Sequence, residues 1–283
     1  MSLKLATVEE LRTEADEVVG GLRGAGRPAT VESSPESDWT VSRIQESIRG
    51  GSIDLGLVPC RAPVDGVERA AVLRREEPRD VLVSAASGGW TLARIRSGTT
   101  IGLVGARRLG LLRAHRPDLR PLSLTNGHTP ASVLRAGNVG ALIVGSAQAR
   151  RLGLSELTKE SLDPKSWMPE PGQGTLVLLA RADDPSTRSA ASLFDDQPSR
   201  RTWLCETALA QALGAGSDAP LGALALPFGR WIRLWAMATS LDGSRVVRAD
   251  LTGSAEDPEG LGRAVADLLL MRGVGTLLGG ETS

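Results

Sequence analysis

The sequence predicts an α/β protein with a smaller α+β region at its carboxyl end, and three observations point to this fold class. Segments of strand length alternate with segments of helical spacing over the first two thirds of the chain, which is typical of βαβ units and predicts parallel strands. Proline-containing segments near 77–78 and 168–175 separate these units. After residue 200, two helical segments enclose three strand-like segments. A chain of 283 residues is long enough for two or three domains.

The amino-terminal unit is predicted to begin with a short strand over 3–6 and a helix over 7–24. Apolar residues in this helix recur at intervals of three and four positions, and Thr7 with Glu10 has the spacing of a helix-capping box. A second helix and a buried strand follow in this unit, over 40–49 and 53–58.

The rest of the chain is interpreted in the same way. The second unit alternates strands over 80–84, 100–104, 121–124 and 141–144 with helices over 106–114, 129–136 and 146–152. A strand over 175–181 and a polar stretch over 182–200, part helix and part loop, lead to the last unit. There we expect helices over 202–213 and 257–271, a glycine-rich turn over 214–218, and strands over 221–227, 230–238 and 245–252.

The composition argues against several classes of function. The formal net charge is zero, so no overall field favours nucleic acid or a membrane surface as a partner. No apolar run approaches the roughly 18 residues of a membrane helix, and the first residues lack the apolar core of a signal peptide. We therefore expect a cytoplasmic protein. Cys60 and Cys205 form neither a disulfide framework nor a zinc-binding pattern, so we also expect no bound metal.

Several stretches, in order along the chain, resemble the hydroxymethylbilane synthase (porphobilinogen deaminase) family. They are EEPRDVLVS (76–84), IGLVGARR (101–108), RAHRPDLR (113–120), ARRLGL (149–154), PEPGQGTLVL (169–178) and CETALAQALGAGSDAPLGALA (205–225). Each piece alone would be weak, but ordered pieces along the whole chain are specific.

The resemblance implies three domains: two periplasmic-binding-protein-like α/β domains that flank a cleft, and a small α+β domain at the carboxyl end. On this chain they would comprise 1–78 with 175–198, then 79–170, then 199–283. Hinges are expected near 78–80 and 170–175.

The resemblance also implies an enzyme that deaminates porphobilinogen and extends a dipyrromethane primer. In the family a cysteine holds this primer by a thioether, in the loop that matches 214–218. Here Ser217 stands at the position of the cysteine. A thiol is partly ionised near neutral pH, whereas a serine hydroxyl needs a strong base, and Asp218 need not face it. We therefore expect no dipyrromethane cofactor; the simplest interpretation is that Ser217 and Asp218 are turn residues.

Other functional positions of the family are also changed. The family's catalytic aspartate, which offsets positive charge on the pyrrole nitrogen, matches Ala62, which has no carboxylate. Three arginines that the family uses to hold substrate carboxylates match Val8, Leu124 and Pro130. From these losses we expect that the chain does not make hydroxymethylbilane.

Cys60 and Arg61 match the domain 1 rim of the family's cleft, and His128 matches the domain 2 rim. A cysteine and a histidine across a hinged cleft are a candidate nucleophile and base, and Arg61 could stabilise the thiolate. The alternative is that Cys60 fills a small buried space and His128 is an exposed turn residue.

Arg107 and Arg108 match a pair of arginines in the family. They follow a glycine turn at the start of a predicted helix, where backbone N–H groups and the helix dipole favour an anion. With Arg61 and Asn126 they are predicted to bind the substrate, a small ligand that bears carboxylates. The alternative is that both are ordinary surface arginines.

Three functions remain open from the sequence. The chain is a repurposed enzyme that acts on a small anionic molecule, as in specialised metabolism; or it is a non-catalytic binding protein; or it is an authentic porphobilinogen deaminase with a divergent site. The substrate and the oligomeric state stay undetermined at this level.

Overall fold

The structure is a computed structural model that describes residues 2–32, 39–62, 64–84, 90–124, 130–154, 157–216 and 218–278. The chain divides into two compact units. Unit 1 comprises Met1–Glu76 with Gly174–Arg200, and unit 2 comprises Glu77–Gln173 with Arg201–Ser283. The chain therefore passes between the units three times.

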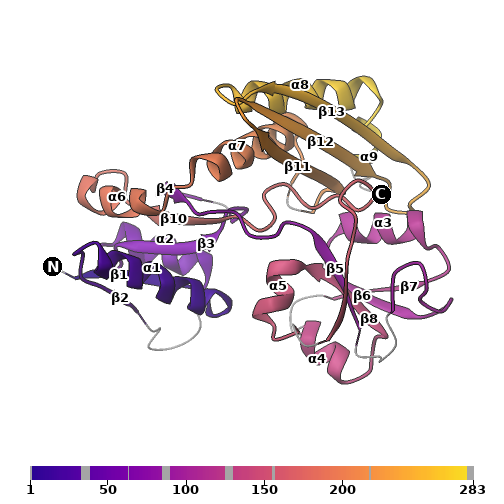
Figure 1. The fold of residues 1–283 in the computed structure, drawn as a ribbon, viewed down its shortest axis with the longest axis horizontal. Helices are drawn as coiled ribbons and strands as arrows, with labels where there is room; N and C mark the ends of the chain where they lie inside the picture. The colour runs from indigo at the N-terminus through magenta and orange to yellow at the C-terminus, as the bar shows by residue number, and fades with distance from the viewer. Residues whose placement is uncertain are drawn as a thin grey trace. The chain divides into compact units, whose positions relative to one another are not determined.

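Unit 1 contains a five-stranded mixed sheet with the strand order β2-β1-β3-β10-β4 (Figure 1). The strands are β1 (Leu3–Thr7), β2 (Ala29–Val31), β3 (Leu55–Pro59), β4 (Glu68–Val72) and β10 (Leu176–Ala180). Strand β1 pairs in parallel with β2 and β3. Strand β10, which follows the second passage between the units, runs antiparallel to β3 and β4.

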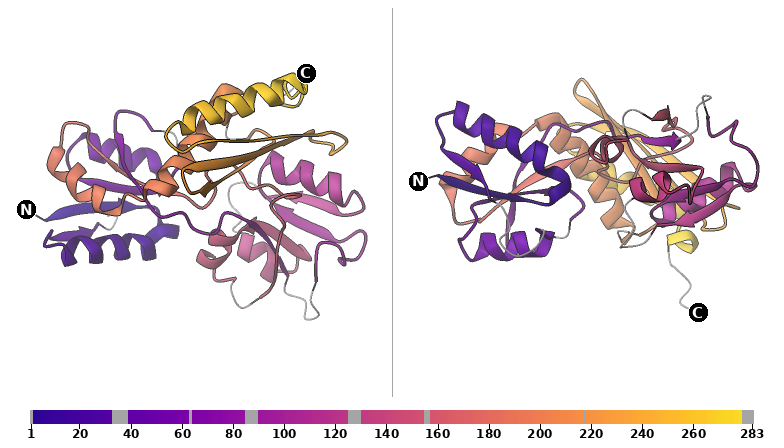
Figure 2. Two further views of the ribbon diagram at one scale, coloured as in Figure 1. Left: turned by 45° about the horizontal axis from the view of Figure 1, so that its top comes forward. Right: turned by 90° about the horizontal axis from the view of Figure 1, so that it is seen from below.

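Helices cover both faces of this sheet (Figure 2). The apolar face with Leu55 and Leu57 packs against α1 (Arg12–Gly24), and α6 (Pro185–Ala191) adds to the same core. On the opposite face lies α2 (Val41–Arg49), where a Cβ on Gly56 would come within 2.4 Å of Cγ2 of Ile44. The missing side chain of Gly56 thus lets α2 approach the sheet closely.

Unit 2 begins with a second mixed sheet, in the order β7-β6-β8-β5-β9. Its strands are β5 (Asp80–Ser84), β6 (Thr100–Leu103), β7 (Arg120–Ser123), β8 (Ala141–Gly145) and β9 (Thr158–Ser161), and its helices are α3 (Ala106–His115), α4 (Pro130–Arg135) and α5 (Ser146–Arg151). Strand β6 is parallel to β7 and β8, and β5 is antiparallel to β8 and β9.

The same unit ends with a three-stranded antiparallel sheet of β11 (Leu221–Phe228), β12 (Trp231–Thr239) and β13 (Val246–Ser254). Helices α7 (Gln197–Ala212) and α8 (Pro258–Met271) pack against one face of it, and α9 (Gly275–Leu278) closes the end of this core. Helix α3 touches the end of β12, since a Cβ on Gly110 would lie 2.5 Å from Cγ2 of Thr239.

The predicted α/β class with a small α+β carboxyl-terminal region is confirmed by these sheets and helices. The expectation of parallel strands is only partly right, because β5 and β10, which each follow a passage between the units, run antiparallel to their neighbours. The three-domain division stays a prediction; the structure groups the segments predicted as domains 2 and 3 in one compact unit.

The expected capping role of Thr7 is wrong. Thr7 ends β1, and its hydroxyl donates a hydrogen bond to the carbonyl oxygen of Leu57 at 2.9 Å. The helical segment begins instead as a 3-10 turn, η1 (Glu9–Leu11), after Val8, and no side chain caps it. Thr7 therefore stabilises the pairing of β1 with β3, and its hydroxyl is not available to cap the helix as the local pattern predicted.

Candidate functional site

Arg107 and Arg108 lie in the first turn of α3 and are buried, with 1% and 6% of their surface exposed. Gly105 precedes the helix at φ 91°, a left-handed conformation that glycine adopts without strain. The chain thus turns sharply from β6 into α3 and directs both arginines inward. They are not ordinary surface arginines.

Both guanidinium groups bind Asp80, the first residue of β5, which has no exposed surface. Nη2 of Arg107 lies 2.8 Å from Oδ2 of Asp80. Nε and Nη2 of Arg108 donate to Oδ2 and Oδ1 at 3.0 and 2.9 Å, a two-pronged contact that fits the planar shape of both groups. The indole N–H of Trp167 adds a hydrogen bond to Oδ2 at 3.0 Å.

The charges of this cluster set the protonation state of Asp80. Burial alone would raise the pKa of its carboxyl, but the charges of Arg107 and Arg108 and their hydrogen bonds outweigh burial and hold the pKa well below its usual range. Asp80 is therefore ionised at neutral pH. Its single negative charge faces two positive charges.

Gln173, in the turn before β10, completes the cluster. Its Nε2 donates hydrogen bonds to Oδ1 of Asp80 at 2.8 Å and to the carbonyl oxygen of Pro78 at 2.6 Å. Its Oε1 accepts longer bonds from Nη2 of Arg107 and of Arg108, at 3.4 and 3.3 Å. The sequence analysis assigned no role to Gln173 or Asp80, although they lie in PEPGQGTLVL and EEPRDVLVS, two of the stretches that resemble the family.

This arrangement can hold an anion, and in the structure the anion is an internal carboxylate. The two arginines and Asp80 together carry one net positive charge in a buried place next to the start of α3. Nη1 of Arg107 and Nη1 of Arg108 also donate to the carbonyl oxygens of Met168 and Val104, at 2.6 and 3.0 Å. The binding of an external carboxylate by Arg107 and Arg108 remains a prediction.

Cys60 follows β3 and is buried, with 4% of its surface exposed; its backbone N–H donates to the carbonyl oxygen of Thr175 at 3.0 Å. Arg61 is exposed. Arg69 is a further guanidinium group near the thiol. Burial lowers the pKa of Arg69, while interaction with Cys60 acts in the opposite direction. Nη2 of Arg69 also binds the carbonyl oxygen of Ala62 at 3.1 Å.

Two of the predicted site residues, Asn126 and His128, lie outside the described residues. The pairing of Cys60 with His128 as nucleophile and base therefore stays a prediction. The burial of Cys60 agrees with the alternative interpretation, in which this residue fills a small buried space.

The loop over 214–218 contains Ser217, which also lies outside the described residues, and Asp218, which is exposed. Cys205 is the nearest thiol in the sequence, but it lies within α7 with no exposed surface. Burial, with the nearby charge of Glu206, raises the pKa of the Cys205 thiol to about 12. Cys205 is thus a poor nucleophile at neutral pH.

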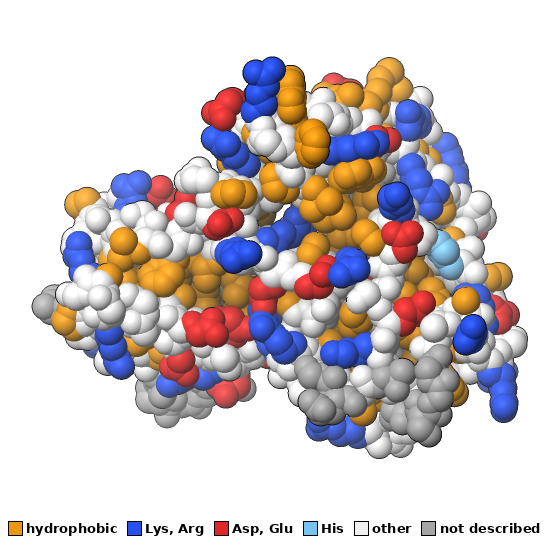
Figure 3. Space-filling model, viewed as in Figure 1, with side chains coloured by type: hydrophobic (Ala, Val, Ile, Leu, Met, Phe, Trp, Pro, Cys, Tyr) orange, Lys and Arg blue, Asp and Glu red, His pale blue; other side chains and the backbone are white. Residues whose placement is uncertain are grey.

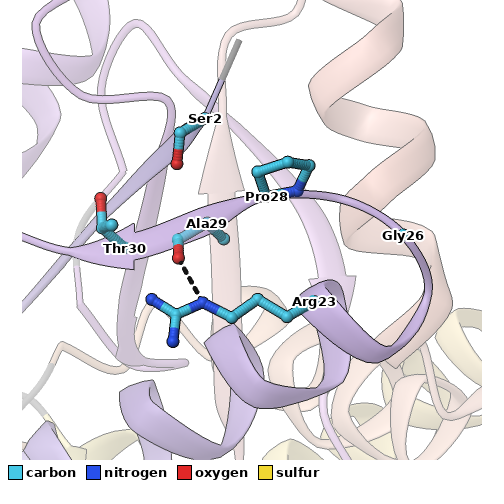
Figure 4. Close-up of a pocket in the computed structure, with 6 residues that line it drawn as sticks. All are labelled: Ser2, Arg23, Gly26, Pro28, Ala29 and Thr30. Carbon is cyan, nitrogen blue, oxygen red and sulfur yellow. Dashed lines mark hydrogen bonds between the residues drawn. The ribbon is translucent and has the colours of Figure 1, made fainter.

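Unit 1 has a shallow hollow of about 430 Å³ at the edge of its sheet, beside β2 (Figure 4). It is lined by Ser2, Arg23, Gly26, Pro28, Ala29 and Thr30. Nε of Arg23 donates to the carbonyl oxygen of Ala29 at 2.8 Å, so this guanidinium group already ties α1 to β2.

Within the described ranges, no group of three or more His, Cys, Asp or Glu side chains could hold a metal ion. In this same part of the chain, none of the helices combines the length and the apolar character needed to cross a membrane. On the face drawn in Figure 3, acidic and basic side chains lie interspersed, in keeping with the balanced composition.

Comparison with known proteins gives consistent results. Residues 41–189 match a family model described as porphobilinogen deaminase, dipyrromethane cofactor binding domain. The porphobilinogen deaminase of Roseiflexus castenholzii is 39% identical over 246 residues, which covers 85% of this chain and 80% of that protein. The porphobilinogen deaminase of Acidothermus cellulolyticus is 32% identical over 292 residues, with 94% and 87% of the two chains covered.

A solved structure, the lipoprotein Tp32 of Treponema pallidum, is 13% identical to this chain. The two align with a TM-score of 0.47 over 72% of this chain and 95% of that one. At this score the likeness carries no argument about function.

These matches correct one expectation from the sequence. From Ser217 we expected no dipyrromethane cofactor on this chain. That expectation is wrong, because the stretch that matches the family is its dipyrromethane cofactor binding domain and the curated relatives are porphobilinogen deaminases. One changed loop residue was too little to decide the question against a match that extends over most of the chain.

Proposed function

Because the chain belongs to the porphobilinogen deaminase family, we propose that it binds a carboxylate-bearing pyrrole of the dipyrromethane class through Arg107 and Arg108. The observation that carries this proposal is the buried cluster of two guanidinium groups around one carboxylate. Porphobilinogen and its oligomers carry two carboxylates on each ring. Guanidinium groups suit carboxylates of this kind because of their planar donor geometry.

The residues present fit the dipyrromethane group in one respect and differ in another. The arginine pair has the planar, charged donors that suit its carboxylates, and in the structure these donors bind Asp80 and backbone carbonyl oxygens. When bound, the group serves as the primer to which further pyrrole units are added. The loop over 214–218 supplies a serine in place of the thiol that holds the primer in the family, and Cys205 is buried within α7.

We propose further that the family's chain extension is slow in this protein. Ala62 matches the aspartate that offsets charge on the pyrrole nitrogen, and its methyl group cannot do so. Loss of one such electrostatic contact lowers a rate by roughly 10²–10³-fold. The chain would then act on, or hold, a small anionic pyrrole without forming hydroxymethylbilane at the rate of its relatives.

One observation favours a second candidate, an authentic porphobilinogen deaminase. The 39% identity to the Roseiflexus castenholzii enzyme extends over most of both chains. In that case other residues would replace the function of the aspartate. The two candidates agree on the ligand and differ on the rate of turnover.

Calorimetric titration with porphobilinogen tests the binding site. Arg108→Lys keeps the positive charge but loses the planar guanidinium donors proposed to bind the ligand, so we expect porphobilinogen binding about tenfold weaker, the loss of one charge-assisted hydrogen bond. The matched control is Arg113→Lys on the exposed side of the same helix, which should bind like the wild type. Equal affinity in all three proteins would contradict the site, and circular dichroism would show that both variants fold.

A further inference from the structure

The three passages of the chain between the units are tied to one another by hydrogen bonds. They lie at 76–77, 173–174 and 200–201. On the unit 1 side, the backbone N–H of Glu76 donates to the carbonyl oxygen of Gly174 at 2.9 Å. On the unit 2 side, Nε2 of Gln173 donates to the carbonyl oxygen of Pro78 at 2.6 Å. The first two passages are thus linked by one hydrogen bond on each side of the boundary between the units.

Gln173 extends this link to the arginine pair, because the same amide group contacts Asp80 and both guanidinium groups. Gly172 and Gly174 on either side of it have φ of 75° and 81°, so the backbone turns sharply at both neighbours. Gly145 lies beside the amide, and a Cβ there would be in ordinary contact with Nε2 at 3.4 Å. The side chain is therefore held in one place from several directions.

The third passage is joined to the first by the backbone N–H of Arg75, which donates to Oγ of Ser199 at 2.8 Å. Glu206, a fully buried residue of α7, connects the turn before Gln173 to the carboxyl-terminal sheet. Its Oε2 accepts a hydrogen bond from the backbone N–H of Gly172 at 2.5 Å. Its Oε1 accepts one from the backbone N–H of Ala225 in β11 at 2.7 Å. The residue before Gln173 is in this way fixed to the carboxyl-terminal sheet.

We propose that Gln173 is a positioning residue that couples the passages between the units to Arg107 and Arg108. A change in chain direction at 76–78 or 172–174 displaces the amide, and the partners of both arginines change with it. Conversely, a carboxylate bound by the arginines alters the hydrogen bonds that hold Pro78. Such coupling is reciprocal by thermodynamic necessity. Only the ligand experiment below rests on the proposed function.

Hydrogen–deuterium exchange of the full chain tests the coupling without any ligand. In Gln173→Ala we expect amides over 74–79 and over 104–110 to exchange about fivefold faster, the effect of losing one net hydrogen bond. Arg108→Lys should raise exchange over 74–79 in return. The matched control is Gln211→Ala, an exposed glutamine of α7, which should change neither segment.

A merely structural role of Gln173 would give a different pattern. Faster exchange confined to 171–176, or spread evenly over both units, would overturn the proposal. If Gln173→Ala fails to fold, Gln173→Glu keeps the length of the side chain and replaces the amide donor with an acceptor, and the same pattern is expected.

Porphobilinogen then supplies a second readout. In the wild type it should slow exchange over 74–79, and in Gln173→Ala this remote effect should disappear while slower exchange over 104–110 persists. A remote effect that survives in Gln173→Ala would overturn the coupling. If the wild type does not bind porphobilinogen, the proposed function fails, and the ligand-free comparison alone decides the role of Gln173.

Discussion

Asp80 compensates two guanidinium groups inside unit 2, and its charge is therefore important for stability. Asp80→Asn keeps the shape of the side chain but removes the carboxylate charge that both buried guanidinium groups face. We expect the free energy of unfolding to fall by about 3–5 kcal/mol. Urea unfolding followed by circular dichroism measures this. Asp250→Asn, which breaks the exposed pair with Arg233, is the matched control and should cost less than about 1 kcal/mol. Equal losses would contradict the account.

The lowered pKa of Asp80 also predicts how stability depends on pH. Its charge contributes fully above the carboxyl's unfolded pKa of about 3.9, and the contribution is lost as pH falls below that value toward the lower folded pKa. The wild type should therefore lose stability ever more steeply as pH falls below about 4, and Asp80→Asn should lose less over that acid range. The same slope in both proteins would show that other carboxyl groups govern acid unfolding.

The sequence identified the arginine pair but not its partners. A glycine turn before two arginines at a helix start is a local pattern, and so it could be predicted. Asp80 lies 27 residues before Arg107 in the chain and Gln173 lies 65 residues after Arg108. No local pattern indicates which distant side chain meets a buried guanidinium group.

At the level of helices and strands, the missed strands share one property. Strands β2, β4 and β9, which the sequence analysis did not predict, are all at the edges of their sheets. Edge strands are often short or polar, because they pack against fewer neighbours, and so they lack the apolar pattern that marks a central strand. The central strands β5, β6 and β8 follow their predicted ranges within one residue at each end.

Gly110 shows how α3, which carries the arginine pair, is held against β12. A Cβ at this position would lie 2.6 Å from the backbone oxygen of Ser240 as well as 2.5 Å from Thr239, so Gly110→Ala should destabilise unit 2 by about 1–3 kcal/mol. Gly20 in α1 has no atom within 4 Å of such a Cβ, and Gly20→Ala should stabilise the protein by about 0.5–1 kcal/mol. Thermal unfolding measures both. A Gly110→Ala protein that unfolds at the same temperature as the wild type would contradict the close packing of α3.

For the whole molecule, the sequence predicted the fold class and the family, because ordered motifs along the entire chain carry that information. It did not predict the grouping of the second and third predicted domains in one compact unit, since the contacts of α3 with β12 join segments more than 100 residues apart. The expectation that no dipyrromethane cofactor binds was based on Ser217 alone, and it was wrong because residues 41–189 match the cofactor binding domain of the family.

We propose that this protein keeps the ligand chemistry of its family but extends a pyrrole chain slowly, because Ala62 offers no carboxylate. The most direct test is the rate of porphobilinogen consumption, measured beside the Roseiflexus castenholzii porphobilinogen deaminase under identical conditions. We predict that this protein binds porphobilinogen and consumes it roughly 10²–10³-fold more slowly, the cost of one lost electrostatic contact. Equal rates of consumption in the two proteins would contradict the claim and establish an authentic deaminase.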